Sequence, residues 1–214
     1  MSTVSARPGR VLLEDVPWQT YSRLVRAFDG RRSIRLTYDR GALEIMTISV
    51  EHENHGWFMG RIVLTLTEDL GLPVMGGGSA TFRSRRKLRG LEPDNCFWIT
   101  SEPRVRGKRK IDLDVDPPPD LAIEIDVTRS SLSRLDIYAA LGVPEVWRFD
   151  CEDLTIHLLG PDGEYREIAS SPTFPGIKPR DLVRFMNMRF RTEENSVIRQ
   201  FRTWVRERIA TSEK

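Results

Sequence analysis

The sequence predicts an α/β fold in which helices flank one mixed central sheet. Three observations predict it: helical and extended segments alternate along the chain, residues 121–127 form a strongly apolar extended segment, and amphipathic helices precede and follow that segment. No internal repeat, low-complexity tract or long linker interrupts the 214 residues. We therefore expect one principal domain at 11–190, preceded by a tail at 1–10 and followed by a C-terminal helix at 191–214.

Apolar residues at helical spacing predict four helices and a short helical turn. Pro17 opens the first helix, because proline is favoured at helix starts. Gly71 and Gly142 end the next two, because glycine readily takes the left-handed conformation that closes a helix. The expected helices are 18–29, 51–70, 131–141 and 193–209, and the helical turn is expected at 181–186.

Alternating or continuous apolar runs predict the strands. The segments 39–41 and 161–163 have turn sequences, so each predicts a hairpin between its flanking strands. The segment 73–82 is expected to be extended and to bend at its three consecutive glycines. The other expected strands are 34–38, 43–48, 95–99, 121–127, 145–149, 154–159 and 165–168.

The composition excludes several classes of protein. Apolar residues make up 39%, charged residues 30%, and the net charge is +2, so the chain is not a disordered polyelectrolyte. Two cysteines are too few for a disulfide framework or a four-cysteine zinc module, so we expect free thiols. No apolar run approaches the roughly 18 residues that cross a membrane, and the N-terminus lacks the apolar core of a signal peptide. A cytoplasmic location is therefore expected.

The small net charge hides a separation of charge along the chain. Ten basic and three acidic residues lie from Arg83 to Lys110, which gives this segment +7 and the remainder −5. Six carboxylates follow from Asp112 to Asp126, with no basic residue among them. This pattern suits a polyanion held near a metal ion, or alternatively two solvated loops. The residues that we expect to contact nucleic acid are Arg85, Arg86, Lys87, Arg106 and Lys108.

Glu124 and Asp126 stand two apart on an otherwise apolar strand. The two-residue period of a strand places both side chains on one face, with Cα atoms about 6–7 Å apart. Two buried carboxylates this close are unfavourable unless a cation compensates them, and their repulsion raises the pKa of one of them. A divalent metal ion or a basic partner resolves both problems. Alternatively, the pair lies at a solvated strand end or binds an arginine.

Two further sites carry chemically useful residues. Asp94 follows Pro93 at the start of the strand 95–99, where it either projects toward Glu124 or serves as an ordinary turn or cap residue. The segment from His52 to His55 falls one residue short of a zinc-protease motif, and no third Cys or His ligand is evident. Zinc is therefore disfavoured, and His52 is expected at a helix start or near the carboxylates.

These residues carry a resemblance to known nucleases. Pro93-Asp94, followed thirty residues later by Glu124-Ile125-Asp126 on an apolar strand, resembles the PD-(D/E)xK nuclease pattern. The chain from roughly Val11 to Ile168 also resembles the Uma family of predicted restriction endonucleases. The residues that carry this second resemblance are Glu51-His52-Glu53, Gly60, Pro119 to Glu124, Tyr138, Gly142 to Trp147 and Asp150.

The resemblance implies a restriction-endonuclease-like core and a metal-dependent endonuclease that hydrolyses phosphodiester bonds in nucleic acid, with DNA as the expected substrate. Asp94 and Glu124 match the two metal-binding carboxylates of the family, and hard oxygen ligands suit Mg²⁺ or Mn²⁺. The metal would polarise the scissile phosphate and help to generate hydroxide from water. Further candidate ligands are the Ile125 carbonyl and Glu51, which stands at the start of the first long helix.

Asp126 departs from the superfamily pattern, because it occupies the position of the catalytic lysine. In the Uma family, a lysine one helical turn before a tyrosine takes the place of this catalytic lysine. Here that position holds Arg134, which is four residues before Tyr138 and on the same helix face. Arg134 can stabilise charge on a phosphate but cannot act as a general base. Alternatively, it pairs with Asp126 or Glu124. Asp126 is either a third metal ligand or a source of repulsion that weakens catalysis.

The leading hypothesis is a Mg²⁺- or Mn²⁺-dependent endodeoxyribonuclease with Asp94, Glu124, Asp126 and Arg134 as its catalytic residues. The alternative is a catalytically impaired nucleic-acid-binding protein that keeps the nuclease fold, which Asp126 motivates. A carboxylate-pair glycosidase is less favoured, because two carboxylates on the same side of one strand are poorly placed to flank a bond. A homodimer is expected if the target is a palindromic duplex.

Overall fold

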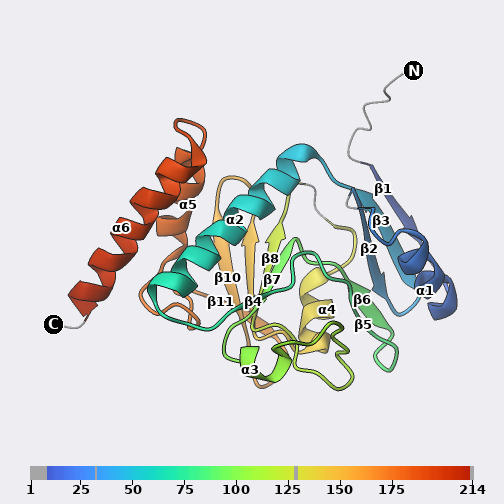
Figure 1. Cartoon of the computed structure of the whole chain (residues 1–214). Helices are drawn as coiled ribbons and strands as arrows, with labels where there is room; N and C mark the ends of the chain where they lie inside the picture. Colours follow the sequence, from blue (N-terminus) through green and yellow to red (C-terminus); the bar gives the residue numbers. More distant parts are fainter. Residues whose placement is uncertain (1–8, 32, 128–129, 213–214) are drawn as a thin grey trace.

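The computed structural model describes residues 9–31, 33–127 and 130–212, and it arranges them as two β-sheets with helices packed around them (Figure 1). The mixed α/β class predicted from the sequence is confirmed. The helices of the described chain are α1 (Trp18–Ala27), α2 (Val50–Asp69), α3 (Glu102–Val105), α4 (Arg134–Leu141), α5 (Pro179–Met188) and α6 (Glu194–Ser212).

The larger sheet is mixed and forms the centre of the molecule. Its strands are β4 (Met75–Gly76), β7 (Asn95–Trp98), β8 (Leu121–Ile125), β9 (Glu145–Phe149), β10 (Leu154–Leu159) and β11 (Tyr165–Ile168). They lie in the order β11-β10-β9-β8-β7-β4. The neighbours β8 and β9 are parallel, as expected for strands joined through a helix, and the other neighbours are antiparallel.

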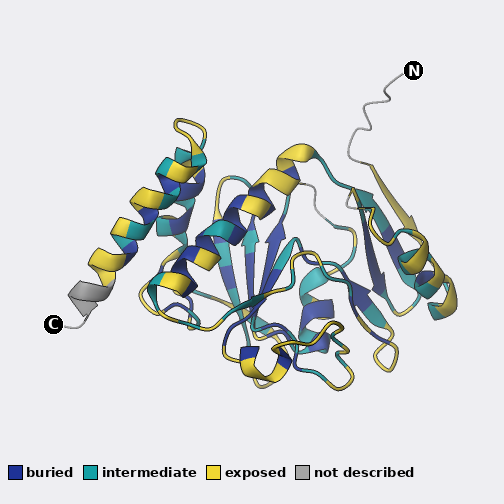
Figure 2. Ribbon diagram, in the orientation of Figure 1, coloured by how far each residue is buried: buried dark blue, intermediate teal, exposed yellow. Residues whose placement is uncertain are grey.

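Side chains of β8 alternate between two cores. Leu121, Ile123 and Ile125 pack with α2, α5 and α6 on one face, whereas Ala122 packs with α4 on the other. Figure 2 shows that both the central strands and the inward sides of these helices are buried. Because the period of a strand is two, Glu124 belongs to the face that α4 covers. Cover on both faces explains the almost unbroken apolar sequence of this strand.

The helix α2 crosses the larger sheet close to β7. A Cβ atom at Gly60 would collide with the side-chain amide nitrogen of Asn95, so the absence of a side chain permits this approach. Ser49 caps the start of α2, because its hydroxyl accepts a hydrogen bond from the His52 N–H at 3.2 Å. The first turns of α2 are thereby brought to the beginning of β7.

A second, smaller sheet was not predicted, because the sequence analysis placed every strand in one mixed sheet. This sheet is antiparallel throughout and has the order β1-β3-β2-β6-β5. Its strands are β1 (Arg10–Leu13), β2 (Ile34–Asp39), β3 (Ala42–Thr47), β5 (Phe82–Ser84) and β6 (Arg89–Leu91). The strands β5 and β6 have three residues each within the basic segment, which is too short for apolar alternation to be recognised.

The chain ends are described in part. Residues 1–8 of the predicted tail and residues 213–214 lie outside the described residues, and Arg10 of that tail begins β1, whose four residues are all exposed. The helix α6 packs against α2 and α5, and a domain boundary at residue 190 stays a prediction. Cys96 and Cys151 are free thiols, as expected. Within the described ranges, no helix combines the length and apolar character needed to cross a membrane.

Candidate active site

Glu124 of β8 faces the first turns of α4. This helix begins after Ser133, whose hydroxyl accepts a hydrogen bond from the Asp136 N–H. Arg134 and Tyr138 are four residues apart and therefore share one face of α4. Both donate hydrogen bonds to the same oxygen, Glu124 Oε1: Arg134 Nη2 lies 2.7 Å away, and the Tyr138 hydroxyl is the second donor.

Arg134 also joins the two sheets. Its Nη1 donates to the Thr37 hydroxyl of β2 at 2.7 Å, and its Nη2 donates to the Glu92 backbone carbonyl at 2.7 Å. The Arg134 side chain is 10% exposed and that of Glu124 is 5% exposed, so their ion pair is buried. Arg134 Nε is buried without a hydrogen-bond partner among the described residues.

Asp94 stands one residue before β7 and extends its ladder with β8. The Asp94 N–H donates to the Ile123 carbonyl at 3.1 Å, and its Oδ2 accepts from the Ile125 N–H at 2.8 Å. His52 Nε2 lies 3.4 Å from Asp94 Oδ2, and Arg35 Nε lies 4.0 Å from Oδ1. The Asp94 side chain is only 7% exposed, so this carboxylate is held by main-chain and basic groups inside the protein.

Burial raises the pKa of both carboxyl groups, that of Asp94 to about 6 and that of Glu124 to about 7. Arg134 opposes both shifts, whereas the nearby Asp94 charge adds to the shift of Glu124. Burial also lowers the pKa of His52, which favours its neutral form. Burial and the Glu124 charge together raise the pKa of Tyr138, so its hydroxyl stays a donor. Arg134 therefore compensates the two carboxylates incompletely.

A small cavity of about 10 Å³ connects these groups, and Asp94, Glu124 and Ile125 line it. Its volume is about the minimum that holds one water molecule. The remaining described residues of its lining are Arg35, Met46, His52, Glu92, Asp126, Ser130 and Arg134. The predicted catalytic residues Asp94, Glu124, Asp126 and Arg134 thus border one cavity.

Asp126 and Glu51, two further predicted site residues, are less directly involved in the small cavity than Asp94 and Glu124. Asp126 borders the cavity, but its Oδ2 accepts from Arg148 Nε at 2.9 Å and lies 2.6 Å from Arg148 Nη2. Arg148 is opposite Glu124 in the parallel ladder of β8 and β9, so strand register produces this pair. Glu51 is exposed in the first turn of α2 and is not among the described residues that line the cavity.

The segment between β8 and α4 is tethered by Glu44 of β3. Glu44 is 1% exposed, and its two oxygens accept from the Ser130 hydroxyl and the Ser131 N–H, each at 2.6 Å. The smaller sheet therefore fixes the segment that leads to Arg134. Sequence reasoning missed Glu44, and it missed Arg35 of β2 as well. A charged residue inside an apolar strand was the available signal in both cases.

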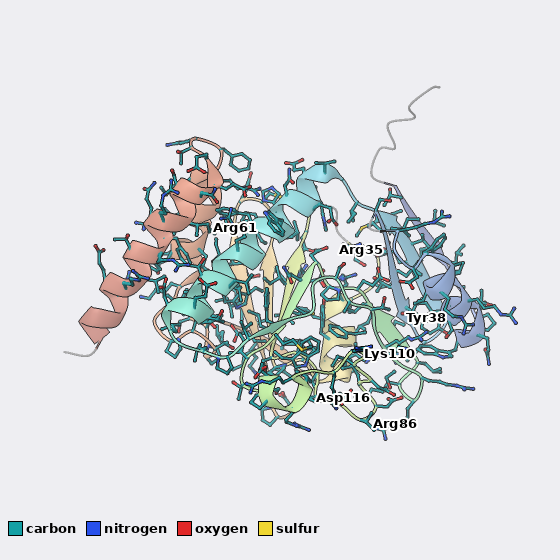
Figure 3. All side chains as sticks on the ribbon, in the orientation of Figure 1. Arg35, Tyr38, Arg61, Arg86, Lys110 and Asp116 are labelled. Carbon is teal, nitrogen blue, oxygen red and sulfur yellow. The ribbon has the colours of Figure 1, made fainter. Side chains whose placement is uncertain are left out.

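A larger cleft of about 1070 Å³ adjoins the small cavity. It lies between α1, the start of β2 and the segments 75–85 and 108–114, and Arg35 and Glu92 line both spaces. Arg35 is 5% exposed, and its Nη2 donates to Glu53 Oε1 at 2.9 Å. Figure 3 shows Arg35 between the two sheets, with Lys110 lower on the same side of the molecule. The carboxylates therefore lie behind a cleft of much greater volume.

Two of the five residues predicted to contact nucleic acid line this cleft, namely Arg85 and Lys108. Lys108 forms an ion pair with Asp116, which reduces its availability for a phosphate. Arg26 and Arg31, from the end of α1 and the turn that follows it, line the cleft as well. Sequence reasoning missed these two, because they are distant in sequence from the basic segment.

The other three predicted nucleic-acid residues lie outside the lining of the cleft. Arg106 is bound to Glu102 through two hydrogen bonds of 2.9 and 2.6 Å. Arg86 and Lys87 are exposed in the turn between β5 and β6, and Lys87 donates to the Ala140 carbonyl. Position in the basic segment is therefore a poor guide to which cations share one surface.

The described residues contain no group of three or more His, Cys, Asp or Glu side chains arranged to hold a metal ion. Asp94 and Glu124 nevertheless place two carboxylates on one cavity. Mg²⁺ in proteins commonly takes one or two carboxylates and keeps several waters, whereas zinc sites use three or four protein ligands that are mainly nitrogen and sulfur. The donor set therefore fits a hydrated hard cation.

Comparison with known proteins identifies the family of the chain. A protein-family model named Uma2, described as "Putative restriction endonuclease", matches residues 18–186, which is well over half of the chain. No curated protein matches the sequence. The matched region contains Asp94, Glu124 and Arg134 as well as both sheets except β1. The chain therefore belongs to the Uma2 family, within the restriction-endonuclease-like superfamily.

Proposed function

We propose that this chain is a PD-(D/E)xK-type nuclease whose Asp94 and Glu124 hold Mg²⁺ or Mn²⁺ against a phosphodiester of DNA. One observation carries the proposal: carboxylates from neighbouring strands border one cavity together with Arg134, beside a cleft lined by basic side chains. The family match supports phosphodiester hydrolysis as the reaction.

The raised pKa values of Asp94 and Glu124 support a cation at this position. Two buried carboxylates with incomplete compensation favour protonated forms, and a divalent ion would favour the ionised forms instead. Arg134 and Tyr138 both bind Oε1 of Glu124, so we propose Oε2 as its ligand atom. When bound, the metal supplies Lewis-acid activation of the phosphate and lowers the pKa of its water.

Arg134 is the proposed stabiliser of phosphate charge. Its guanidinium is held 2.7 Å from Glu124 Oε1, and its Nε is buried without a hydrogen-bond partner among the described residues, so a donor remains for a phosphate oxygen. Charge-assisted bonds from arginine to phosphate are strong and directional. Arginine does not deprotonate, so the proton of the attacking water must pass to solvent or to another group.

Cleavage of supercoiled plasmid DNA with Mg²⁺, Mn²⁺ or EDTA tests this function. Asp94→Asn and Glu124→Gln are expected to lower the metal-dependent rate by about 10²–10³, as for removal of one essential electrostatic group. Calorimetric titration should show that both variants also lose Mn²⁺ binding. Glu152→Gln, an exposed carboxylate in the turn after β9, serves as the control and should cleave like the parent. Equal rates for Glu124→Gln and the parent would reject the assignment.

A second candidate function is nucleic-acid binding without hydrolysis. It is favoured by the Arg134–Glu124 pair, because a guanidinium already occupies one oxygen of the proposed ligand. Asp126, at the superfamily lysine position, is bound to Arg148 and provides no replacement cation. This alternative predicts salt-dependent DNA binding with neither Mn²⁺ binding nor cleavage. Metal-dependent turnover that disappears in Asp94→Asn would exclude it.

A further inference from the structure

The larger cleft concentrates positive charge, part of which no carboxylate of the described residues neutralises. Eight of its described lining residues are basic and four are acidic. Five of the basic residues have no carboxylate oxygen of a described residue within 4.0 Å of their charged nitrogens. They are Arg26, Arg83, Arg85, Arg109 and Lys110. Cations elsewhere are often paired, as Arg89 is with Asp39 at 2.8 Å. A concave surface with unpaired cations is the electrostatic pattern of a phosphate-binding track.

The volumes and burial of the two spaces favour one strand over a duplex. The cleft of about 1070 Å³ is slightly larger than the roughly 300–1,000 Å³ of sites for single small ligands, which is room for a few nucleotides. Asp94 and Glu124 are 7% and 5% exposed, so a phosphate must enter the protein to reach them. A stacked duplex holds its phosphates on a wide outer surface, with a major groove alone about 12 Å across. A single strand can bend into such a recess.

Aromatic side chains lie beside these cations. Trp18 and Phe28 line the cleft from α1 and are only partly buried. Trp18 is held in place by Tyr21 and Tyr38, whose ring centres lie 5.1 and 5.5 Å away. The Arg31 guanidinium lies 5.7 Å from the centre of the Phe28 ring. Aromatic faces combined with a basic groove bind single strands without strong sequence preference, because every base has a face that can stack.

We infer that the larger cleft binds a single-stranded segment of nucleic acid and directs one of its phosphates past Arg35 to Asp94 and Glu124. The unpaired cations of the lining contact the phosphates, and Trp18 and Phe28 offer surfaces on which bases stack. Only the delivery for cleavage rests on the proposed function. Binding of the strand is a separate property, and it can be measured without metal.

The binding experiment uses Asp94→Asn protein in EDTA, so that cleavage cannot interfere. Fluorescence anisotropy compares labelled oligo(dT) and oligo(U) of about 12 nucleotides, within the site size of single-strand-binding folds, with a DNA duplex of the same length. We expect at least one single strand to bind about tenfold more tightly than the duplex, which corresponds to about one stacked base. Tighter binding of either strand supports the inference, and the stronger binder shows whether the DNA or the RNA oligonucleotide is preferred.

A salt titration locates the bound strand. Arg83→Ala/Arg85→Ala and Arg109→Ala/Lys110→Ala, each made in the Asp94→Asn protein, remove two cations from each of two segments that line the cleft. Each double variant should reduce the slope of log K against log salt by about 1.4, since each phosphate contact with a single strand contributes about 0.7. The control Arg180→Ala/Arg191→Ala removes two exposed arginines outside the cleft lining and should leave the slope unchanged.

Several results would overturn the inference: duplex binding as tight as single-strand binding, no binding of any oligonucleotide, or a slope that the cleft variants leave unchanged. Single-strand binding by a parent protein that cleaves no DNA or RNA with Mg²⁺ or Mn²⁺ would support the inference while rejecting the proposed nuclease. Cleavage of duplex DNA but not of single strands would support the proposed nuclease and reject the inference that the cleft binds a single strand. The two proposals therefore fail independently.

Discussion

The small cavity and the larger cleft share Arg35 and Glu92 but hold charge in opposite ways. In the cavity, Glu124 and Arg134 are buried and compensate each other at 2.7 Å. In the cleft, cations such as Arg109 are exposed to solvent. Buried charges are tolerable only when they are paired, whereas solvated charges need no partner. Changes in the cavity should therefore alter protein stability, and changes in the cleft should alter binding.

The largest expected effect is that of Arg134→Met on stability. Removing the guanidinium leaves Glu124 buried without its ion-pair partner, which typically costs about 3–5 kcal/mol. Urea denaturation of the metal-free protein measures the free energy of unfolding.

Arg148→Met is the matched control, because Arg148 also pairs with a carboxylate at the end of β8 but is 38% exposed. Its loss should cost about 1 kcal/mol or less, as for other solvent-accessible pairs. Adding Glu124→Leu to Arg134→Met removes the unpaired buried charge, so the double variant should be more stable than Arg134→Met alone. Similar losses for Arg134→Met and Arg148→Met would remove the distinction between buried and solvated pairs.

The second effect is a fall in stability as pH rises. The pKa of Asp94 is raised from 3.8 to about 6 by burial, so the folded protein binds more protons than the unfolded chain between these pH values. The free energy of unfolding of the metal-free protein should therefore decrease from about pH 4 to about pH 6, by about 3 kcal/mol for a shift of two units. Denaturant titrations at several pH values measure this slope.

Asp94→Asn removes the titrating group and should flatten that part of the pH profile. The raised pKa of Glu124, about 7, continues the decrease toward neutral pH in the parent. Asp94→Asn removes a charge that contributes to this second shift, so the variant should lose stability with pH less steeply over the whole range. Parallel profiles for the two proteins would show that Asp94 titrates normally and is not held in a poorly solvated site.

A smaller effect is expected at Glu44, which belongs to neither space but holds the segment that leads to Arg134. Glu44→Gln keeps one carbonyl oxygen for Ser130 or Ser131 and loses the charge, so we expect a loss of about 1–2 kcal/mol. Thermal denaturation detects this loss. The exposed Glu164→Gln should leave the melting temperature unchanged, and an equal response of both variants would argue against the tether.

The smallest stability effect is expected in the cleft. Arg109→Ala/Lys110→Ala should change the free energy of unfolding by about 0.5 kcal/mol or less, because both side chains are exposed and neither has a carboxylate partner among the described residues. Urea denaturation in parallel with the salt titration checks this. A large destabilisation would mean that these cations support the fold, and the contrast between the two spaces would then be weaker.

Local patterns predicted much of the fold and some of the site. The ranges 145–149, 154–159 and 165–168 coincide with β9, β10 and β11, because each has apolar runs bounded by turns. The hairpin of β2 and β3 was predicted, but the smaller sheet as a separate unit was not, because its other pairings join segments far apart in sequence, as when Tyr38 pairs with Gly90. Such pairing depends on which surfaces meet, and a sequence window does not contain that information.

The candidate site shows the same division. Asp94 and Glu124 were recognisable as chemically unusual residues in apolar surroundings, and the spacing of Arg134 and Tyr138 placed both on one helix face. The sequence left open whether Arg134 pairs with Asp126 or with Glu124, and it did not indicate Arg148 as a partner. That Arg134 binds Glu124 while Asp126 binds Arg148 follows from the position of α4 and from the register of β9 against β8.

By itself, the sequence determined the α/β class, the apolar strand that carries Glu124 and the residue types that suit a hard metal ion. Those features follow from periodicity and side-chain chemistry within a few residues. Only the tertiary structure decided that Arg35 and Arg134 lie beside the carboxylates and that Glu44 holds the segment leading to Arg134. It also decided that cations from α1 and from residues 83–110 line one cleft. Charges distant in sequence interact only after folding has brought them together and removed the intervening water, because water screens them in the unfolded chain.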